Sequence, residues 1–387
     1  MQTFTGGNSI ALLRNGTEYF PALIAAIEQS VSSVYIETYI LAEDAVGLAV
    51  ADALVAAVRR GVEVRIVVDG FGSKPYLTRV LMDRLRLAGV LLVRYREDAF
   101  PMTWRRARLR RLHRKLAVVD GRFAFVGGIN LIDDMNTPGQ TPPRVDFAVR
   151  VEGPLMLPIT DAVNRFWRLL RVLPADLSRL PALVLTPVIA PCGNIKAKFA
   201  VRDNFRFRRQ IELGYLAALR VARTDVVIAN AYFFPGIRFR RALIAAVARG
   251  ATVTLVLQAR VEFRLLRYAT RALYGQLLAG GVNIVEYERS FLHAKVAVVD
   301  GRWATVGSSN IDPFSLLLAR EANIIVRDVA FSDQLRLELT RLINEGGRRV
   351  VRDVWARRSL AARVLHWCAY GLARALTGLL GARSARW

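Results

Sequence analysis

One stretch of this chain is written twice. Residues 112–131 and 292–311 align without gaps at an offset of 180, and 13 of the 20 aligned positions are identical. Further matching segments surround both copies: 34–41 with 226–233, 53–70 with 242–259, 87–95 with 278–287, and 145–153 with 321–328. A repeat of this extent indicates two copies of one structural unit, so the fold has to be built from two equivalent halves.

Each copy alternates short runs of β-branched residues with segments of helical periodicity. In the first copy, residues 21–30 and 48–60 have the apolar spacing of helices, whereas residues 34–41 and 62–69 have the composition of buried strands. Alternation of this kind is typical of an α/β sheet with both faces covered. The sequence therefore predicts an α/β fold with two pseudo-symmetric halves.

Proline residues mark the limits of these halves. Six prolines fall between residues 154 and 201, around a helix predicted at residues 159–172. We expect a first half at 1–153, a helix and proline-rich linker at 154–199, a second half at 200–350 and a C-terminal segment at 351–387. Arginines interrupt the apolar stretch 360–380 of that last segment, which indicates an amphipathic helix, either in a membrane interface or packed on the second half.

The charge of the chain restricts its partners. Lys and Arg number 56 against 32 Asp and Glu, a net charge of +24, although 53% of the residues are hydrophobic. Such a chain is not disordered, and its surface attracts polyanions, either nucleic acid or an anionic membrane. Two cysteines exclude a disulfide framework and a four-cysteine zinc site. We expect neither a signal peptide nor an ordinary membrane-spanning helix.

The repeated stretch carries a histidine, a lysine and an asparagine at equivalent positions. These are His113, Lys115 and Asn130 in the first copy, and His293, Lys295 and Asn310 in the second. The whole chain has only three histidines and five lysines, and four of these eight residues fall in the two motifs. Residues i and i+2 of a strand share a face, so each histidine projects beside its lysine. Both sets can converge on one phosphate group, whose oxygens suit a compact ammonium.

Further residues of the repeat are candidates for the same site. Asp120 and Asp300 complete the two motifs and are grouped with the catalytic residues, although each opens an Asp-Gly turn and is expected to act structurally. Ser308 replaces the second glycine of the first copy, and its hydroxyl is predicted to bind the substrate phosphate. Glu37 and Tyr39 are weaker candidates for the mouth of the pocket. We expect His366 to be structural.

The motif His-x-Lys-x4-Asp followed by GGxN or GSxN, present twice, resembles that of the phospholipase D superfamily. Within it, the strings IETYIL (36–41), LHRKLAVVDGRFAFVGGIN (112–130) and VGSSNIDPFSL (306–316) are similar to bacterial cardiolipin synthases of the type without N-terminal transmembrane helices. The resemblance implies two α/β/α sandwich halves packed face to face, followed by the C-terminal amphipathic helix.

The resemblance also implies a mechanism. One histidine forms a phosphohistidine and the other acts as acid and base; we assign His113 as the nucleophile and His293 as the acid–base, an assignment that the pseudo-symmetry makes reversible. A downstream carboxylate orients each histidine. Asp146 follows His113 by 33 residues and Glu321 follows His293 by 28, so these are the expected orienting pair. No metal or other cofactor is implied.

Several activities fit this resemblance. The first is cardiolipin synthesis by phosphatidyl transfer, with phosphatidylglycerol or phosphatidylethanolamine as donor; the others are phospholipid hydrolysis, nuclease action and a silent lipid-binding scaffold. Arginine-rich segments at 104–114 and 260–274 interleave with apolar residues and favour lipid, whereas no aromatic platform for base stacking is evident. We therefore expect phospholipid substrates, an anionic membrane surface as partner, no nucleic acid, and peripheral association with the cytoplasmic face of a bacterial inner membrane. The oligomeric state stays open.

Overall fold

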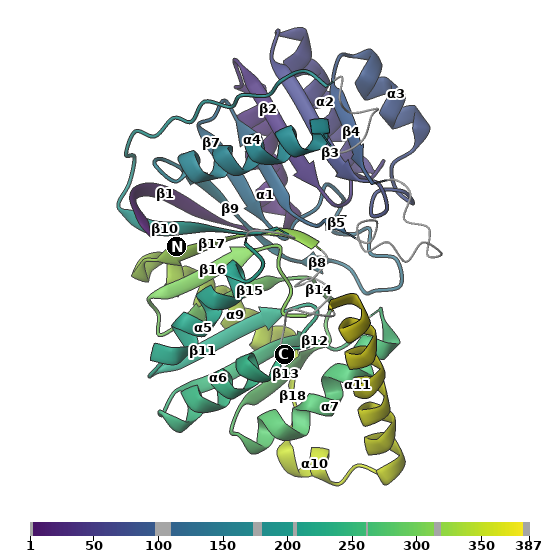
Figure 1. Cartoon of the computed structure of the whole chain (residues 1–387), viewed down its shortest axis with the longest axis vertical. Helices are drawn as coiled ribbons and strands as arrows, with labels where there is room; N and C mark the ends of the chain where they lie inside the picture. The colour runs from purple at the N-terminus through teal and green to yellow at the C-terminus, as the bar shows by residue number, and fades with distance from the viewer. Residues whose placement is uncertain are drawn as a thin grey trace.

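A computed structural model describes residues 3–96, 110–172, 180–203, 207–260, 262–312 and 319–381. Figure 1 shows two α/β halves, one above the other, with the first half in purple and blue and the second in green. The arginine-rich segment predicted at 104–114 lies outside the described residues, except for its last five positions.

The first half contains a sheet and the helices that cover it. Its elements are β1 (Thr5–Arg14), α1 (Asn15–Glu28), β2 (Ser33–Thr38), α2 (Ala45–Arg59), β3 (Glu63–Asp69), α3 (Arg79–Leu87), β4 (Leu91–Tyr95), β5 (Arg111–Leu112), β6 (Lys115–Val119), β7 (Phe123–Gly127), β8 (Arg144–Val145), β9 (Phe147–Glu152) and α4 (Met156–Val172). Strands β2, β3 and β4 are parallel, and β6 returns antiparallel to β2.

The second half repeats this plan. Its elements are β10 (Ile195–Arg202), α5 (Gln210–Val221), β11 (Asp225–Asn230), α6 (Ile237–Ala248), β12 (Thr252–Gln258), α7 (Arg264–Ala279), β13 (Asn283–Tyr287), β14 (Phe291–Leu292), β15 (Lys295–Val299), β16 (Trp303–Gly307), β17 (Ala319–Arg327), α9 (Val329–Gly346), β18 (Gly347–Arg349), α10 (Arg352–Ala356) and α11 (Leu360–Gly381). Strands β11, β12 and β13 are the parallel set, and β15 is antiparallel to β11.

The two sheets join into one. Among the described residues the strand order is β18-β13-β12-β11-β15-β16-β17-β10-β1-β9-β7-β6-β2-β3-β4, and the antiparallel pair β1–β10 is the seam. The sheet also folds over at this seam, so that β16 and β17 contact β7 and β9. The predicted α/β fold with two packed halves is therefore confirmed, whereas the continuous sheet was not foreseen, because the apolar pattern of a strand does not encode its neighbour.

The two halves share part of their hydrophobic core. One apolar cluster fills the space between the inner faces of both sheets, α4 and α9, and it includes Val149 of the first half and Ile324 of the second. Two separate clusters lie beneath the outer helices, one with Leu54 of α2 and one with Leu243 of α6. Each half thus has helices on both sheet faces, and the shared cluster sets how the two halves meet.

The C-terminal helix α11 packs along α7 (Figure 1). His366, Ala369 and Ala373 are buried in this contact, whereas Val364 and Trp367 are exposed. His366 lies between the rings of Trp355 and Tyr268, in agreement with a structural role. No helix in the described part of the chain has the length and apolarity needed to cross a bilayer.

Candidate active site

The two motif histidines stand where the halves meet. His113 follows the two-residue strand β5, which pairs with β17 of the second half, and His293 follows β14, which pairs with β8 of the first half. The backbone N–H of His113 donates to the carbonyl of Arg320 at 3.1 Å, and that of His293 donates to the carbonyl of Val145 at 2.8 Å. Each motif is thus held in place by the opposite half.

The carboxylates pair with the histidines across the halves. His113 Nδ1 lies 3.0 and 3.1 Å from the two carboxylate oxygens of Glu321, and His293 Nδ1 lies 2.6 Å from Asp146 Oδ2. Both carboxylates were predicted to orient histidines, but the expected pairing within each half is wrong. The reason is that β5 and β14 cross over, which carries each histidine to the strand end of the other half.

This pairing decides the tautomer of each ring. A carboxylate accepts hydrogen bonds, so Nδ1 carries the proton of the neutral imidazole and Nε2 keeps its lone pair. The buried Glu321 and Asp146 also fix the ring orientation, since each contacts its histidine at hydrogen-bond distance. Two neutral imidazoles with their Nε2 atoms available are suited to nucleophilic attack and proton transfer.

The carboxylates are supported differently in the two halves. A Cβ at Gly128 would lie 2.2 Å from Asp146 Oδ1, so only glycine leaves room for this carboxylate. Ser308 occupies the equivalent position of the second half, and its Oγ donates to Glu321 Oε2 at 2.5 Å. The hydroxyl of Ser308 therefore has a different partner from the predicted phosphate, because it is fully buried against the longer carboxylate.

The two motif lysines are buried beside the histidines. Lys115 Nζ donates to the carbonyl of His113 at 2.8 Å and lies 5.3 Å from the ring centre of Tyr39. Lys295 Nζ donates to the carbonyl of His293 and lies 3.5 Å from Asp146 Oδ2. Burial lowers the pKa of Lys115 to about 7 and that of Lys295 to about 8, although Glu321 and Asp146 oppose this change. Ammonium groups this poorly solvated are ready to bind an anion.

The same burial affects the histidines. Desolvation lowers the pKa of His113, and the Glu321 carboxylate opposes this shift. The pKa of His293 is lowered further, first by burial and then by the nearby charge of Lys295, whose Nζ is 2.9 Å from Nδ1. Both rings are therefore neutral near pH 7 without substrate.

The predicted asparagines lie just beyond β7 and β16. Asn130 Oδ1 accepts a hydrogen bond from the backbone N–H of Ile40 at 3.2 Å. Asn310 is buried, and its Oδ1, which can only accept, has no hydrogen-bond partner among the described residues.

Asp120 and Asp300 lie away from this site. Five residues of strand separate Asp120 from Lys115, about 16 Å, and its carboxylate accepts hydrogen bonds from the backbone of Val31, Ser32 and Ser33. Asp300 accepts equivalent bonds from residues 223–225. Grouping the two aspartates with the catalytic residues is corrected here: they anchor turns, as the Asp-Gly pattern indicated.

Two positioning residues were missed. Asp69 Oδ2 accepts from the backbone N–H of Leu112 at 2.7 Å, and Gln258 Oε1 accepts from that of Leu292 at 2.9 Å. Each thus holds the residue before a motif histidine. Positions 69 and 258 are equivalent in the repeat, which is the signal that could have found them.

Of the two weaker candidates, Tyr39 and Glu37, only Tyr39 lies beside a motif histidine. Tyr39 lies beside His113, with ring centres 5.0 Å apart, in agreement with a place at the site. Glu37 instead forms a buried ion pair with Arg114. No group of three metal-ligating side chains occurs in the described ranges.

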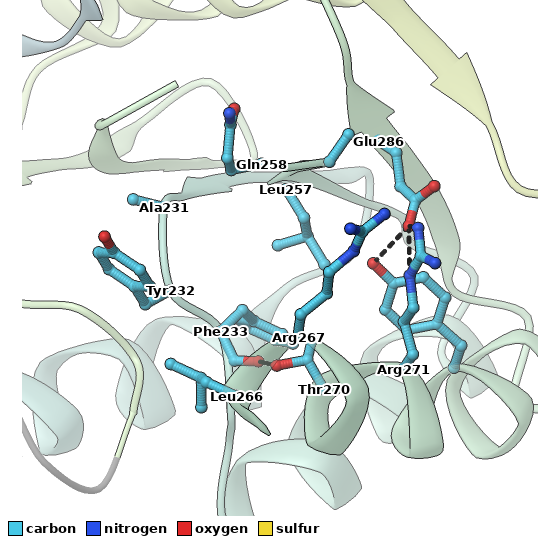
Figure 2. A pocket seen from close by; sticks show the side chains of 12 residues that line it. Ala231, Tyr232, Phe233, Leu257, Gln258, Leu266, Arg267, Thr270, Arg271 and Glu286 are labelled. Atoms are coloured by element: carbon cyan, nitrogen blue, oxygen red, sulfur yellow. Dashed lines mark hydrogen bonds and ion pairs between the residues drawn. The ribbon is translucent and has the colours of Figure 1, made fainter. Parts of the chain in front are cut away.

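A pocket adjoins the second motif (Figure 2). It lies at the carboxyl ends of β11 and β12, where the backbone N–H of Ala231 donates to the carbonyl of Ala294 at 3.0 Å. Figure 2 shows Arg267 of α7 reaching across the pocket towards the strand ends, while Arg271 binds Glu286. Most of the arginine-rich segment 260–274 therefore belongs to helix α7 and lies beside the second motif.

Comparisons with known proteins agree with this geometry. The family described as "Cardiolipin synthase, PLD-like domain" matches residues 23–137 and 215–343. Cardiolipin synthase B of Escherichia coli strain K12 is 40% identical over 347 residues, which cover 87% of this chain and 81% of the relative. A cardiolipin synthase of Oceanobacillus iheyensis is 29% identical over 363 residues, covering 93% and 74%.

Solved structures support the fold alone. Phosphatidylserine synthase of Haemophilus influenzae superposes with a TM-score of 0.70 at 12% identity, covering 96% of this chain and 95% of that one. Polyphosphate kinase of Porphyromonas gingivalis has a TM-score of 0.57 at 13% identity, covering 95% and 53%. The doubled family match and the 40% identity together show that this chain belongs to the cardiolipin synthase family of phospholipase D-like proteins.

Proposed function

We propose that this protein is a cardiolipin synthase, which transfers a phosphatidyl group from phosphatidylglycerol to the glycerol headgroup of a second phosphatidylglycerol. The observation that carries the proposal is the crossed arrangement of two histidines and two carboxylates, in a chain 40% identical to a cardiolipin synthase B. Neither half could assemble such a site alone, since each histidine takes its carboxylate from the other half.

In the first step, His113 Nε2 attacks the phosphorus of the donor lipid. The bond from phosphorus to the glycerol oxygen breaks, and His293 donates its proton to that oxygen, so glycerol leaves and a phosphohistidine remains. The bound phosphodiester supplies the acidic form of His293, because a nearby negative charge raises the pKa that burial and Lys295 lower in the free enzyme.

In the second step, the hydroxyl of the acceptor glycerol attacks the same phosphorus. His293 accepts the proton of that hydroxyl, the phosphorus–nitrogen bond breaks, and the electron pair returns to His113. Splitting one displacement into two gives retention at phosphorus and returns both rings to their starting state.

The remaining groups act on charge and orientation. Lys115, Lys295, Asn130 and Asn310 stabilise the charge on the equatorial phosphate oxygens. Glu321 and Asp146 are positioning residues, since each fixes a tautomer and contacts its ring rather than the substrate.

The substrates place the reaction at a membrane surface. We propose peripheral association with the cytoplasmic face of a bacterial inner membrane, supported by the net charge of +24 and by apolar side chains that α11 exposes. Anionic lipids attract such a surface without a spanning helix.

The test is incubation with phosphatidylglycerol vesicles. We expect cardiolipin and free glycerol in equal amounts. Phosphatidic acid as the only lipid product would identify a hydrolase, and cleavage of plasmid DNA without lipid turnover would identify a nuclease. His113→Ala and His293→Ala should each lose turnover, with thermal unfolding as the check on folding; near-normal activity in either variant would contradict the shared site.

A second experiment identifies the nucleophile. With lipid labelled at phosphorus, the His293→Ala variant should accumulate an acid-labile phosphoenzyme, because His113 remains able to attack. Accumulation in His113→Ala instead would reverse the two roles.

A further inference from the structure

A second basic pocket lies in the C-terminal part of the protein. It is a space of about 1050 Å³, open to solvent, between α7, α10 and α11. Four arginines and three aromatic rings line it: Arg271, Arg352, Arg358, Arg363, Trp355, His366 and Trp367. None of its lining residues is acidic. We refer to it as the C-terminal basic pocket.

The positive charge of this pocket is only partly neutralised. Arg271 is paired with Glu286 at 2.8 Å, and the guanidinium of Arg358 lies 3.5 Å from the ring centre of Trp355. The side chains of Arg352 and Arg363 have no ion pair or hydrogen bond to any residue that the structure describes. Residues 346–387 contain nine arginines and one acidic residue, so the surrounding sequence supplies almost no counter-charge.

The pocket is separate from the catalytic histidines. Helix α7 lines the pocket of Figure 2 with residues between Leu266 and Tyr274 and lines the C-terminal basic pocket from Arg271 onwards, so Arg271 borders both. Figure 1 places α10 at the end of the second half that is remote from the first. None of the lining residues of the C-terminal basic pocket belongs to either motif.

An exposed apolar stripe borders the pocket. On α11, Val364 is 60% exposed, Trp367 56% and Leu372 53%, while the opposite face of the helix packs on α7. In water these apolar side chains stay exposed and contribute no burial to stability. At a bilayer they can enter the boundary between headgroups and acyl chains, while the arginines beside them reach the lipid phosphates. Tryptophan is also common at this depth.

We propose that the C-terminal basic pocket binds the phosphate headgroup of an anionic phospholipid and holds the second half against the membrane. The unneutralised Arg352 and Arg363 recognise the phosphate, and the apolar stripe of α11 lies among the acyl chains of the same leaflet. The exposed aliphatic residues favour lipid over nucleic acid, which offers no apolar phase for them. This inference rests on the proposed action at a membrane surface.

Vesicle binding provides the first test. The variant Arg352→Gln/Arg363→Gln is compared with Arg59→Gln/Arg79→Gln, which removes the same charge from exposed positions of the first half. Sedimentation uses phosphatidylcholine vesicles with and without phosphatidylglycerol. We expect the pocket variant to bind the anionic vesicles about 30-fold more weakly, because each arginine near an anionic surface contributes about 1 kcal/mol of binding free energy. The control should bind like the unmodified protein. Equal binding by both variants would refute lipid binding at the C-terminal basic pocket. Failure of the unmodified protein to bind would refute the membrane association itself.

His366 provides a local reporter for the second test. It lines the pocket and is one of three histidines, so its ring signals can be assigned by NMR with a His366→Gln variant. Titration with dihexanoylphosphatidylglycerol should shift these signals saturably, and the shift should vanish in Arg352→Gln/Arg363→Gln. An equal shift with the phosphatidylcholine analogue or with inorganic phosphate would refute a site for anionic lipid. If an RNA oligonucleotide shifts the His366 signals and the lipid does not, the pocket binds nucleic acid instead.

Discussion

Replacing Lys115 by methionine should stabilise the folded protein while removing its activity. Lys115 is 2% exposed, and burial lowers its pKa from 10.5 to about 7. This difference in pKa, 10.5 − 7 = 3.5, corresponds to about 5 kcal/mol of lost stability. Methionine has a similar length and no charge, so it avoids this cost and loses one hydrogen bond, to the carbonyl of His113, that is worth about 1 kcal/mol.

The sign of the effect follows from proton binding. Between pH 7 and 10.5 the unfolded chain holds a proton on Lys115 that the folded protein releases. The penalty is therefore absent above pH 10.5, grows as the pH falls towards 7 and is constant below it. Allowing for the coupling to Lys295, we expect a net gain of about 3 kcal/mol at pH 7, which for a chain of this length raises the unfolding temperature by about 4 °C.

The assay is thermal unfolding of Lys115→Met and the unmodified protein at pH 7 and pH 10. Lys74→Met is the matched control, because Lys74 is exposed, and it should change nothing at either pH. Turnover of Lys115→Met should fall about 10²–10³-fold, as for loss of one group that stabilises transition-state charge. Unfolding of Lys115→Met at a lower temperature than the unmodified protein at pH 7, or a gain that does not shrink at pH 10, would refute the reasoning.

Four further predictions concern the two motifs and the residues around them. Glu321→Gln should slow turnover about 10²–10⁴-fold by loosening the ring of His113, and because the Glu321 carboxylate raises the pKa of His113, NMR titration should show that pKa falling further; a change confined to His293 would contradict the crossed pairing. The kcat/KM of the unmodified enzyme should decline as pH rises past about 7 to 8, where Lys115 and Lys295 lose their protons, and a rate that keeps rising to pH 10 would exclude a role for both ammonium groups. Gly128→Ala should lose turnover, since its Cβ would displace the Asp146 carboxylate, while Gly371→Ala, with no atom near its Cβ, should not; equal activity would show that Asp146 need not hold its place. Asp120→Asn should lower the free energy of unfolding by about 1–3 kcal/mol in urea titrations and leave kcat of the folded protein intact, and a large loss of kcat would return Asp120 to the catalytic set.

Local sequence was enough to predict the two halves and several of their helices and strands. Each apolar pattern occurs in both copies of the repeat, and its periodicity identifies strands, helices and their buried faces. The neighbouring projection of His113 and Lys115 follows from strand geometry alone, as does the turn at Asp120 from its Asp-Gly pair. Such features depend on residues a few positions apart, which one sequence displays directly.

The tertiary structure alone decided which groups meet in the site. The pairing of His113 with Glu321 depends on β5 and β14, strands of two residues that are too short to show any periodicity. Ser308 was predicted from the sequence to bind phosphate, and only the packing of β16 against β17 assigns its hydroxyl to Glu321. Periodicity predicts which face of a strand a side chain occupies. The carboxylate that each histidine meets comes from a segment 208 or 147 residues away, brought there by the common core of both halves.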